Sequence, residues 1–307
     1  MTNRDDHAER VLLLRRRAHL RRKAGDWLTH TAYLTPSLAG VMLFFFLPLA
    51  MIAYNSTMKS ALNNEFVGME NYKNVLSNKA FLLAGKNTLM FSALAVPLAV
   101  LLALLLALLL NTHLPGRSWF RSIFLNPMMV PVASIVLIWQ VVFSFNGTLN
   151  SSLGGFGVDK IDWMKSDWSR LVILLLFLWK NLGYNMVLFL SALNNVPAEL
   201  LDSAKIDGAG SVKRFLHVSL VYLSPTIFFV GIMSLINSFK IFREVYLLTG
   251  NYPYDALYLL QHFMNNAFRD LDYQKLSSAA IIMCIVMIII VGTLFFAESR
   301  LGKDVEE

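Results

Sequence analysis

The sequence is poor in charge and in cysteine. Of its 307 residues, 15% are Asp, Glu, Lys or Arg and 56% are hydrophobic, whereas charged residues make up about a quarter of a soluble domain. The single cysteine, Cys284, excludes a disulfide within the chain and a metal site built from several thiolates. The six histidines follow no metal-ligand spacing, and no H-E-x-x-H motif occurs. The composition therefore predicts a polytopic membrane protein that is not an enzyme.

Acidic residues are missing from the long hydrophobic runs. A helix needs about 20 apolar residues to cross the ~30 Å hydrocarbon core of a bilayer, and six runs approach this length: 34–54, 88–110, 122–143, 171–193, 223–242 and 277–296. None of them contains Asp or Glu, although transporters driven by ion gradients usually use an intramembrane carboxylate. We expect an all-α fold with six transmembrane helices, and a gradient-driven secondary transporter is the weaker alternative.

Lys and Arg are concentrated in the N-terminal segment and in the loops that would lie on the same side of the membrane as this segment. Residues 1–33 hold eight of them, and the loops that would share this side are short and basic. Because cytoplasmic segments retain Lys and Arg, we expect both termini in the cytoplasm, with a basic tail at 1–33, a transmembrane domain at 34–296 and a C-terminal tail at 297–307. The net charge of +7 then needs no nucleic acid, because anionic lipid headgroups balance such residues.

One short charged loop, at about 194–220, separates the fourth and fifth hydrophobic runs. Its charged residues cannot lie in hydrocarbon and must face water or a partner protein; they include Glu199, Asp202, Lys205 and Asp207. The periodicity predicts two short helices joined by an elbow at Gly208. A helix resting on the lipid surface is the alternative, but such helices prefer Lys and Arg on their polar face, and the first half of this one is acidic.

This loop resembles the "EAA" motif of importer-type ABC transporter permeases, written E-A-A, three residues, G, nine residues, I, any residue, L-P. Asp202, Ser203 and Ala204 stand in the E-A-A places and Gly208 in the glycine place. The spacing is intact, but the motif's final proline is replaced by Val221. Further stretches resemble the sugar-importing branch and its first permease subunit: 34–37, 66–72 and 245–250.

The resemblance implies a set of partners. It implies a heterodimer of two permeases in a bacterial cytoplasmic membrane, a dimer of ABC ATPases that bind ATP and Mg²⁺ below, and an extracytoplasmic solute-binding protein above. The loop would couple this chain to the ATPase through Glu199, Leu201, Asp202, Ser203, Ala204, Asp207 and Gly208. The cargo would be a carbohydrate, expected to be an oligosaccharide, with glycerol phosphate or a polyamine as alternatives.

Polar side chains within the hydrophobic runs are candidates for the substrate pathway. Such residues are costly in hydrocarbon and usually face a cavity or another helix. Aromatic faces and amide, hydroxyl or charged groups suit a sugar; the candidates are Trp139, Gln140, Lys180, Asn181, Tyr184, Asn185, Asn237 and Ser238. The alternative is that they join helices to one another or to the second permease, and Lys180 could pair with an acid on that partner.

Overall fold

The computed structural model describes residues 31, 33–60, 65–112 and 115–301. The predicted basic tail therefore lies almost wholly outside the described residues, as does part of the predicted C-terminal tail. Six helical stretches of the described chain are long and apolar enough to cross a membrane: Tyr33–Ser56, Lys79–Leu110, Val132–Gly154, Ser169–Asn194, Ser211–Thr249 and Tyr273–Ser299. The prediction of an all-α protein with six membrane spans is confirmed.

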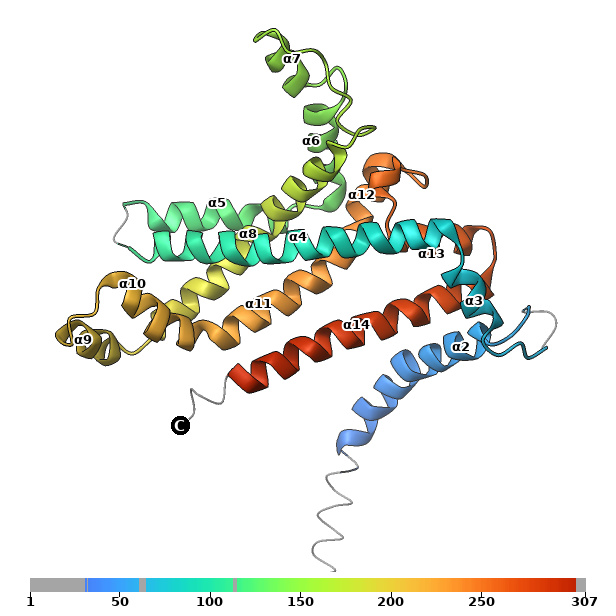
Figure 1. Ribbon diagram of the computed structural model, residues 1–307, viewed down its shortest axis with the longest axis horizontal. Helices are drawn as coiled ribbons and strands as arrows, with labels where there is room; N and C mark the ends of the chain where they lie inside the picture. The colour runs from blue at the N-terminus through green and yellow to red at the C-terminus, as the bar shows by residue number, and fades with distance from the viewer. Residues whose placement is uncertain (1–30, 32, 61–64, 113–114, 302–307) are drawn as a thin grey trace, which may run out of the picture.

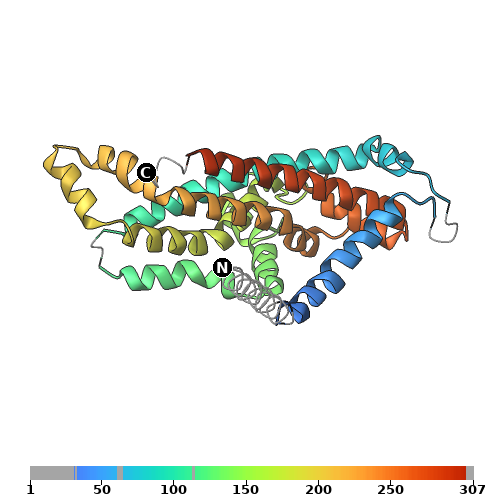
Figure 2. The same cartoon turned by 90° about the horizontal axis from the view of Figure 1, so that it is seen from below.

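The long helices lie side by side, and shorter helices cover both ends of the bundle (Figure 1). The helices are η1 (Met42–Phe46), α2 (Leu47–Ser56), α3 (Glu70–Leu76), α4 (Lys79–Leu110), α5 (Arg117–Met129), α6 (Val132–Phe143), α7 (Thr148–Gly154), α8 (Ser169–Asn194), α9 (Ala198–Ile206), α10 (Ser211–Arg214), η2 (Phe215–Ser219), α11 (Leu220–Lys240), α12 (Phe242–Thr249), η3 (Asp255–Leu257), α13 (Leu260–Arg269) and α14 (Tyr273–Leu301). Figures 1 and 2 both place α9 and α10 at one end of the bundle and α3 at the other.

The centre of the bundle is the contact between α4 and α8. Four alanines at four-residue spacing, Ala95, Ala99, Ala103 and Ala107, form a fully buried stripe on α4. Small side chains let helix backbones approach closely in a membrane, and large side chains of α8, such as Phe177 and Phe189, fill the adjoining core. Because this contact is tight, α8 is held firmly along the length where its polar residues lie.

The third hydrophobic run is not one helix, which corrects the expected helix at 122–143. Helix α5 ends at Met129, Val130 is extended, and α6 begins at Val132. The cause is Pro131, because a proline disfavours the helical conformation of the residue before it. Helix α5 packs along α8, whereas Figure 1 shows α6 turning away from the bundle.

The first and last spans have little cover within this chain. No residue in the most apolar window of Tyr33–Ser56 is buried, and 6% of that of Tyr273–Ser299 is. Lipid or another protein must therefore cover these two helices, since contiguous apolar surface of this size is not left in water.

A buried histidine lies outside the six spans, in α13. The ring of His262 is fully buried against Phe242 and Tyr258. Its Nδ1 accepts a 3.2 Å hydrogen bond from the backbone N–H of Leu259, which requires the neutral ring. Burial lowers the pKa of His262 to about 4.

This lowered pKa predicts acid sensitivity of the end of the bundle near α13. An unfolded histidine has a pKa of about 6.5, so the stability that the neutral ring contributes is complete above pH 6.5 and is lost as the pH falls towards 4. We expect the loss to reach roughly 3 kcal/mol, since one pKa unit corresponds to about 1.4 kcal/mol. Thermal unfolding in detergent between pH 7 and 4 measures it. In His262→Gln the pH dependence over this range becomes shallower; an unchanged slope would contradict the assignment to His262.

Candidate functional site

The charged loop folds into two short helices joined by a glycine elbow, as predicted. Helix α9 ends at Ile206, and Gly208 has a φ of +78°, which favours glycine. The N–H of Gly208 donates to the carbonyl of Lys205 at 3.1 Å, and that of Ala209 donates to the carbonyl of Ala204 at 2.9 Å. These two bonds form a Schellman motif, which fixes the direction of the chain after the helix. Helix α9 is thus a rigid projection rather than a loose loop.

The two faces of α9 differ. Leu201 packs against the core cluster that contains Leu190, Leu193 and Leu223, so it anchors α9 to its own chain. Glu199, Asp202, Ser203, Asp207 and Gly208 are exposed, while Ala204 is half-buried. Leu201 was the apolar residue of α9 expected to contact a partner. The most exposed large apolar residue of α9 is instead Ile206, which is 86% exposed.

A polar cavity of about 290 Å³ lies beside α8, α11 and α12. Its polar lining consists of three basic residues, one acid and two amides: Lys180, Lys240, Arg243, Glu244, Asn181 and Asn237. Three of these six, Lys180, Asn181 and Asn237, are sequence candidates that the fold brings together. Lys180 lies roughly 16 Å along α8 from Ser169, at a rise of about 1.5 Å per residue.

The charge of Lys180 is compensated within this chain. Its Nζ contacts Oε1 of Glu244 in an ion pair, so the pairing needs no acid from a partner. Glu244 is 3% exposed, and Ile241 joins its helix α12 to α11 with nearly helical dihedral angles. The short helix α12 thereby carries the acid to α8.

The two amides of the cavity are joined to each other. Nδ2 of Asn237 donates to Oδ1 of Asn181 at 2.9 Å, and Nδ2 of Asn181 donates to the carbonyl of Phe177 at 2.8 Å. This arrangement fixes both side chains at the cavity wall, where amide groups can hydrogen-bond the hydroxyl groups of a solute.

Two other candidates lie between helices instead of on the cavity wall. Asn185, 1% exposed, donates to Oγ of Ser234 at 2.9 Å and so connects α8 to α11. Ser238, also 1% exposed, shares a 2.8 Å hydrogen bond with Ser92 and so connects α11 to α4. Their observed contacts are those of the alternative in which small polar residues hold helices together.

The remaining candidates are separate from the polar cavity. Trp139 packs on α6 against Phe143 and Trp179, with ring centroids 5.0 and 5.9 Å apart respectively. Gln140 is exposed beside it, and Tyr184 is half-buried on α8 one turn beyond Lys180. None of the three is part of the cavity lining.

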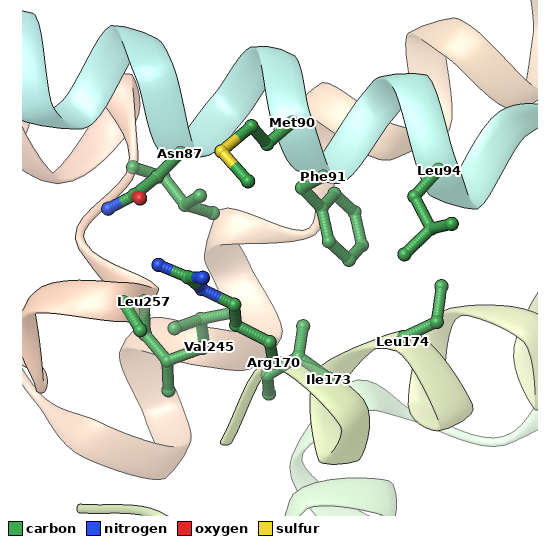
Figure 3. Close-up of a pocket in the computed structure, with 11 residues that line it drawn as sticks. Asn87, Met90, Phe91, Leu94, Arg170, Ile173, Leu174, Val245 and Leu257 are labelled. Atoms are coloured by element: carbon green, nitrogen blue, oxygen red, sulfur yellow. The ribbon is translucent and has the colours of Figure 1, made fainter. Parts of the chain in front are cut away.

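A second, smaller cavity has the wrong chemistry for a hydroxylated solute. It measures about 90 Å³, and Asn87 and Arg170 are the only polar residues of its lining. Figure 3 shows apolar side chains of α4 and α8, including Phe91, Leu94 and Leu174, facing one another across it. Both amide hydrogens of Asn87 bond to the carbonyls of Asp255 and Tyr258. The polar cavity beside α8, α11 and α12 is the candidate passage, because its lining contains three of the sequence candidates.

Sequence reasoning missed Lys240, Arg243 and Glu244 as cavity residues. The fifth hydrophobic run ends at 242, so Lys240 lies at its end and Arg243 and Glu244 lie beyond it, where charges reach water easily. A usable signal was the isolated Lys180, because a charge of this kind usually has a partner, and Glu244 is the nearest acid to the fifth run. Among the residues that the structure describes, no group of three or more His, Cys, Asp or Glu could hold a metal ion.

Comparison with known proteins assigns the family. Residues 95–301 match the family described as "Binding-protein-dependent transport system inner membrane component". The chain is 30% identical over 273 residues to the sn-glycerol-3-phosphate transport system permease protein UgpA of Yersinia pestis, covering 87% of this chain and 91% of that protein. It is 29% identical over 274 residues to the trehalose/maltose transport system permease protein MalF of Thermococcus litoralis, covering 88% and 92% respectively.

The fold agrees with this family. A crystal structure of a bacterial ABC transporter involved in the import of the acidic polysaccharide alginate contains a chain that matches with a TM-score of 0.78 at 22% identity, covering 93% of this chain and 99% of that one. The chain belongs to the family of binding-protein-dependent transport system inner membrane components, the permease subunits of ABC importers.

Proposed function

We propose that this chain forms half of the translocation pore of a carbohydrate importer. The observation that carries the proposal is α9, a rigid projection with an exposed acidic and apolar face, followed by a continuous helical segment from Ser211 to Thr249 that reaches the polar cavity. A motor that moves α9 can displace such a segment as a body, in the manner of rigid-body transitions in other proteins.

The partners follow from the family and from the uncovered surfaces. A second permease covers the exposed first and last spans, an ABC ATPase dimer binds α9, and an extracytoplasmic solute-binding protein delivers the cargo. The ATPase supplies ATP and Mg²⁺, and this chain is not an enzyme. Both termini lie in the bacterial cytoplasm, which places α9 on the same side as the ATPase.

The carbohydrate assignment rests on the relatives and on the cavity. The names of the relatives cover trehalose, maltose and sn-glycerol 3-phosphate, all of which carry several hydroxyl groups. The paired amides Asn181 and Asn237 lie where they can bind such hydroxyls. We propose that the passage runs past Lys180, Asn181, Asn237 and Glu244.

The coupling role predicts a large effect of charge at Ile206. An aspartate there would be buried against the ATPase without a partner, so Ile206→Asp should weaken association by roughly 2 kcal/mol or more, about 30-fold. The measurement is a tagged pull-down of the complex from detergent-solubilised membranes, followed by an ATPase assay of the eluate. Phe156→Asp is the matched control, because Phe156 is also 86% exposed but lies beyond α7, in another part of the chain.

The result separates coupling from general damage. We expect Phe156→Asp to retain the ATPase and Ile206→Asp to lose it while keeping the second permease. If both variants retained full ATPase activity, α9 would not be the docking site. If the wild type eluted with no nucleotide-hydrolysing partner, the importer proposal itself would fail.

A further inference from the structure

The polar cavity carries more positive than negative charge. Lys180, Lys240 and Arg243 line it, and Glu244 is the only acid in its lining. Since Glu244 is paired with Lys180, two positive charges are left uncompensated. Within the described residues, neither Lys240 nor Arg243 has an acid at ion-pair distance, and both side chains are exposed.

The two uncompensated positive charges of the cavity need a counter-charge or water. A charged side chain within a membrane span is costly unless it is paired or hydrated, and a cavity with walls of low dielectric concentrates the field of the charges that line it. A neutral sugar does not compensate this field. A cationic polyamine would add to it, which argues against the polyamine alternative.

The chemistry of the lining matches a cargo with an anionic group. Arg binds carboxylate and phosphate through two parallel hydrogen bonds, and Lys provides a mobile positive charge. Asn181 and Asn237, joined by their 2.9 Å hydrogen bond, lie in the same lining as these cations. A solute that carries hydroxyl groups next to an acidic group can therefore contact both sets of residues at once.

We propose that this passage takes an anionic carbohydrate, bearing a carboxylate or a phosphate, whose charged group contacts Lys240 and Arg243. Glu244 of α12 neutralises Lys180 of α8, so the excess positive charge of the lining is confined to Lys240 and Arg243. This inference rests on the proposed function and names the class of its cargo. The competing explanation is that acids of the second permease neutralise Lys240 and Arg243.

A cysteine reporter in the cavity measures the charge directly. Met128 lines the cavity and is 53% exposed, whereas its neighbour Met129 is 82% exposed and outside the lining. In the assembled complex in membranes, with Cys284→Ser as background, Met128→Cys and Met129→Cys are labelled with an anionic and a cationic methanethiosulfonate. We expect the ratio of the anionic to the cationic labelling rate to be on the order of tenfold higher at Met128→Cys than at Met129→Cys. Adding Lys240→Gln and Arg243→Gln should remove the difference.

Protection identifies the cargo class. Labelling of Met128→Cys is repeated with glucose, glucuronate or glucose 6-phosphate at equal concentration. The proposal requires that at least one of the two acidic sugars slows labelling while glucose does not, and the two acids distinguish carboxylate from phosphate. Equal protection by glucose, no protection by any sugar, or equal rate ratios at the two cysteines would overturn it. These outcomes leave the pull-down result at Ile206 untouched, so the two proposals fail independently.

Discussion

Replacing Gly183 by alanine should destabilise the protein more than any other single methyl group added to its helices. Gly183 is buried in α8, and a Cβ atom there would lie 1.8 Å from the carbonyl oxygen and 2.3 Å from the carbonyl carbon of Phe124 in α5. Both are backbone atoms, so no side chain can rotate away and the two helices must separate. We expect a loss of about 3 kcal/mol, the upper part of the range for overpacked cores, read as a lower thermal midpoint in detergent.

Gly231→Ala is the control for this substitution. Gly231 also lies in the interior of a long helix, α11, but its Cβ would meet no atom within 4 Å. Alanine should stabilise this position by roughly 0.5–1 kcal/mol, because glycine is a poor helix former. Equal thermal midpoints of Gly183→Ala and Gly231→Ala would show that α5 and α8 are not in backbone contact.

Removing Lys180 alone should damage the protein more than removing both members of its ion pair. The side chains of Lys180 and Glu244 are 24% and 4% exposed, so Lys180→Met leaves a carboxylate almost fully buried without its partner. We expect a cost of roughly 3–5 kcal/mol, typical when one partner of a buried pair is lost. The measurement is the unfolding free energy in mixed micelles at neutral pH.

The double variant Lys180→Met/Glu244→Gln decides the interpretation. It removes both charges and keeps the volumes similar, so it should recover most of the lost stability, since replacing a buried pair as a whole is often close to neutral. Strictly additive losses in this double-mutant cycle would mean that the two side chains do not interact. Transport by the double variant separately reports whether the charges also contact the cargo.

Hydropathy predicted the number of spans but not their ends. The run at 88–110 becomes part of α4, which begins at Lys79, because Asn78 caps the helix by accepting hydrogen bonds from the N–H groups of Ala80 and Phe81. The lysines in this stretch end the apolar run without ending the helix. The break at Pro131 is the opposite case, because the residues on both sides are apolar and only backbone geometry separates α5 from α6.

Of the candidate site, the parts that depend on local sequence could be predicted, and the parts that depend on packing between distant segments could not. The spacing of Asp202 and Gly208 identified the rigid projection, whose backbone follows from local sequence. The cavity depends on how distant segments pack. Polarity within the hydrophobic runs identified Lys180 and Asn237 as candidates, but it could not show that Asn185 would instead hydrogen-bond Ser234 between two helices. Ile206 was missed because the sequence alone does not show which apolar face of α9 contacts its own bundle.

The helical segment Ser211–Thr249, in which Ile241 joins α11 to α12, has a consequence for the timing of transport. It begins beside α9 at Ser211 and carries Asn237, Lys240, Arg243 and Glu244 at its far end. In the proposed importer, the segment that the ATPase moves through α9 is therefore the same segment that contributes residues to the lining of the passage. The passage would then change shape at the same time as the ATPase moves. No separate element would stand between them, so ATP hydrolysis would not be uncoupled from movement of the solute.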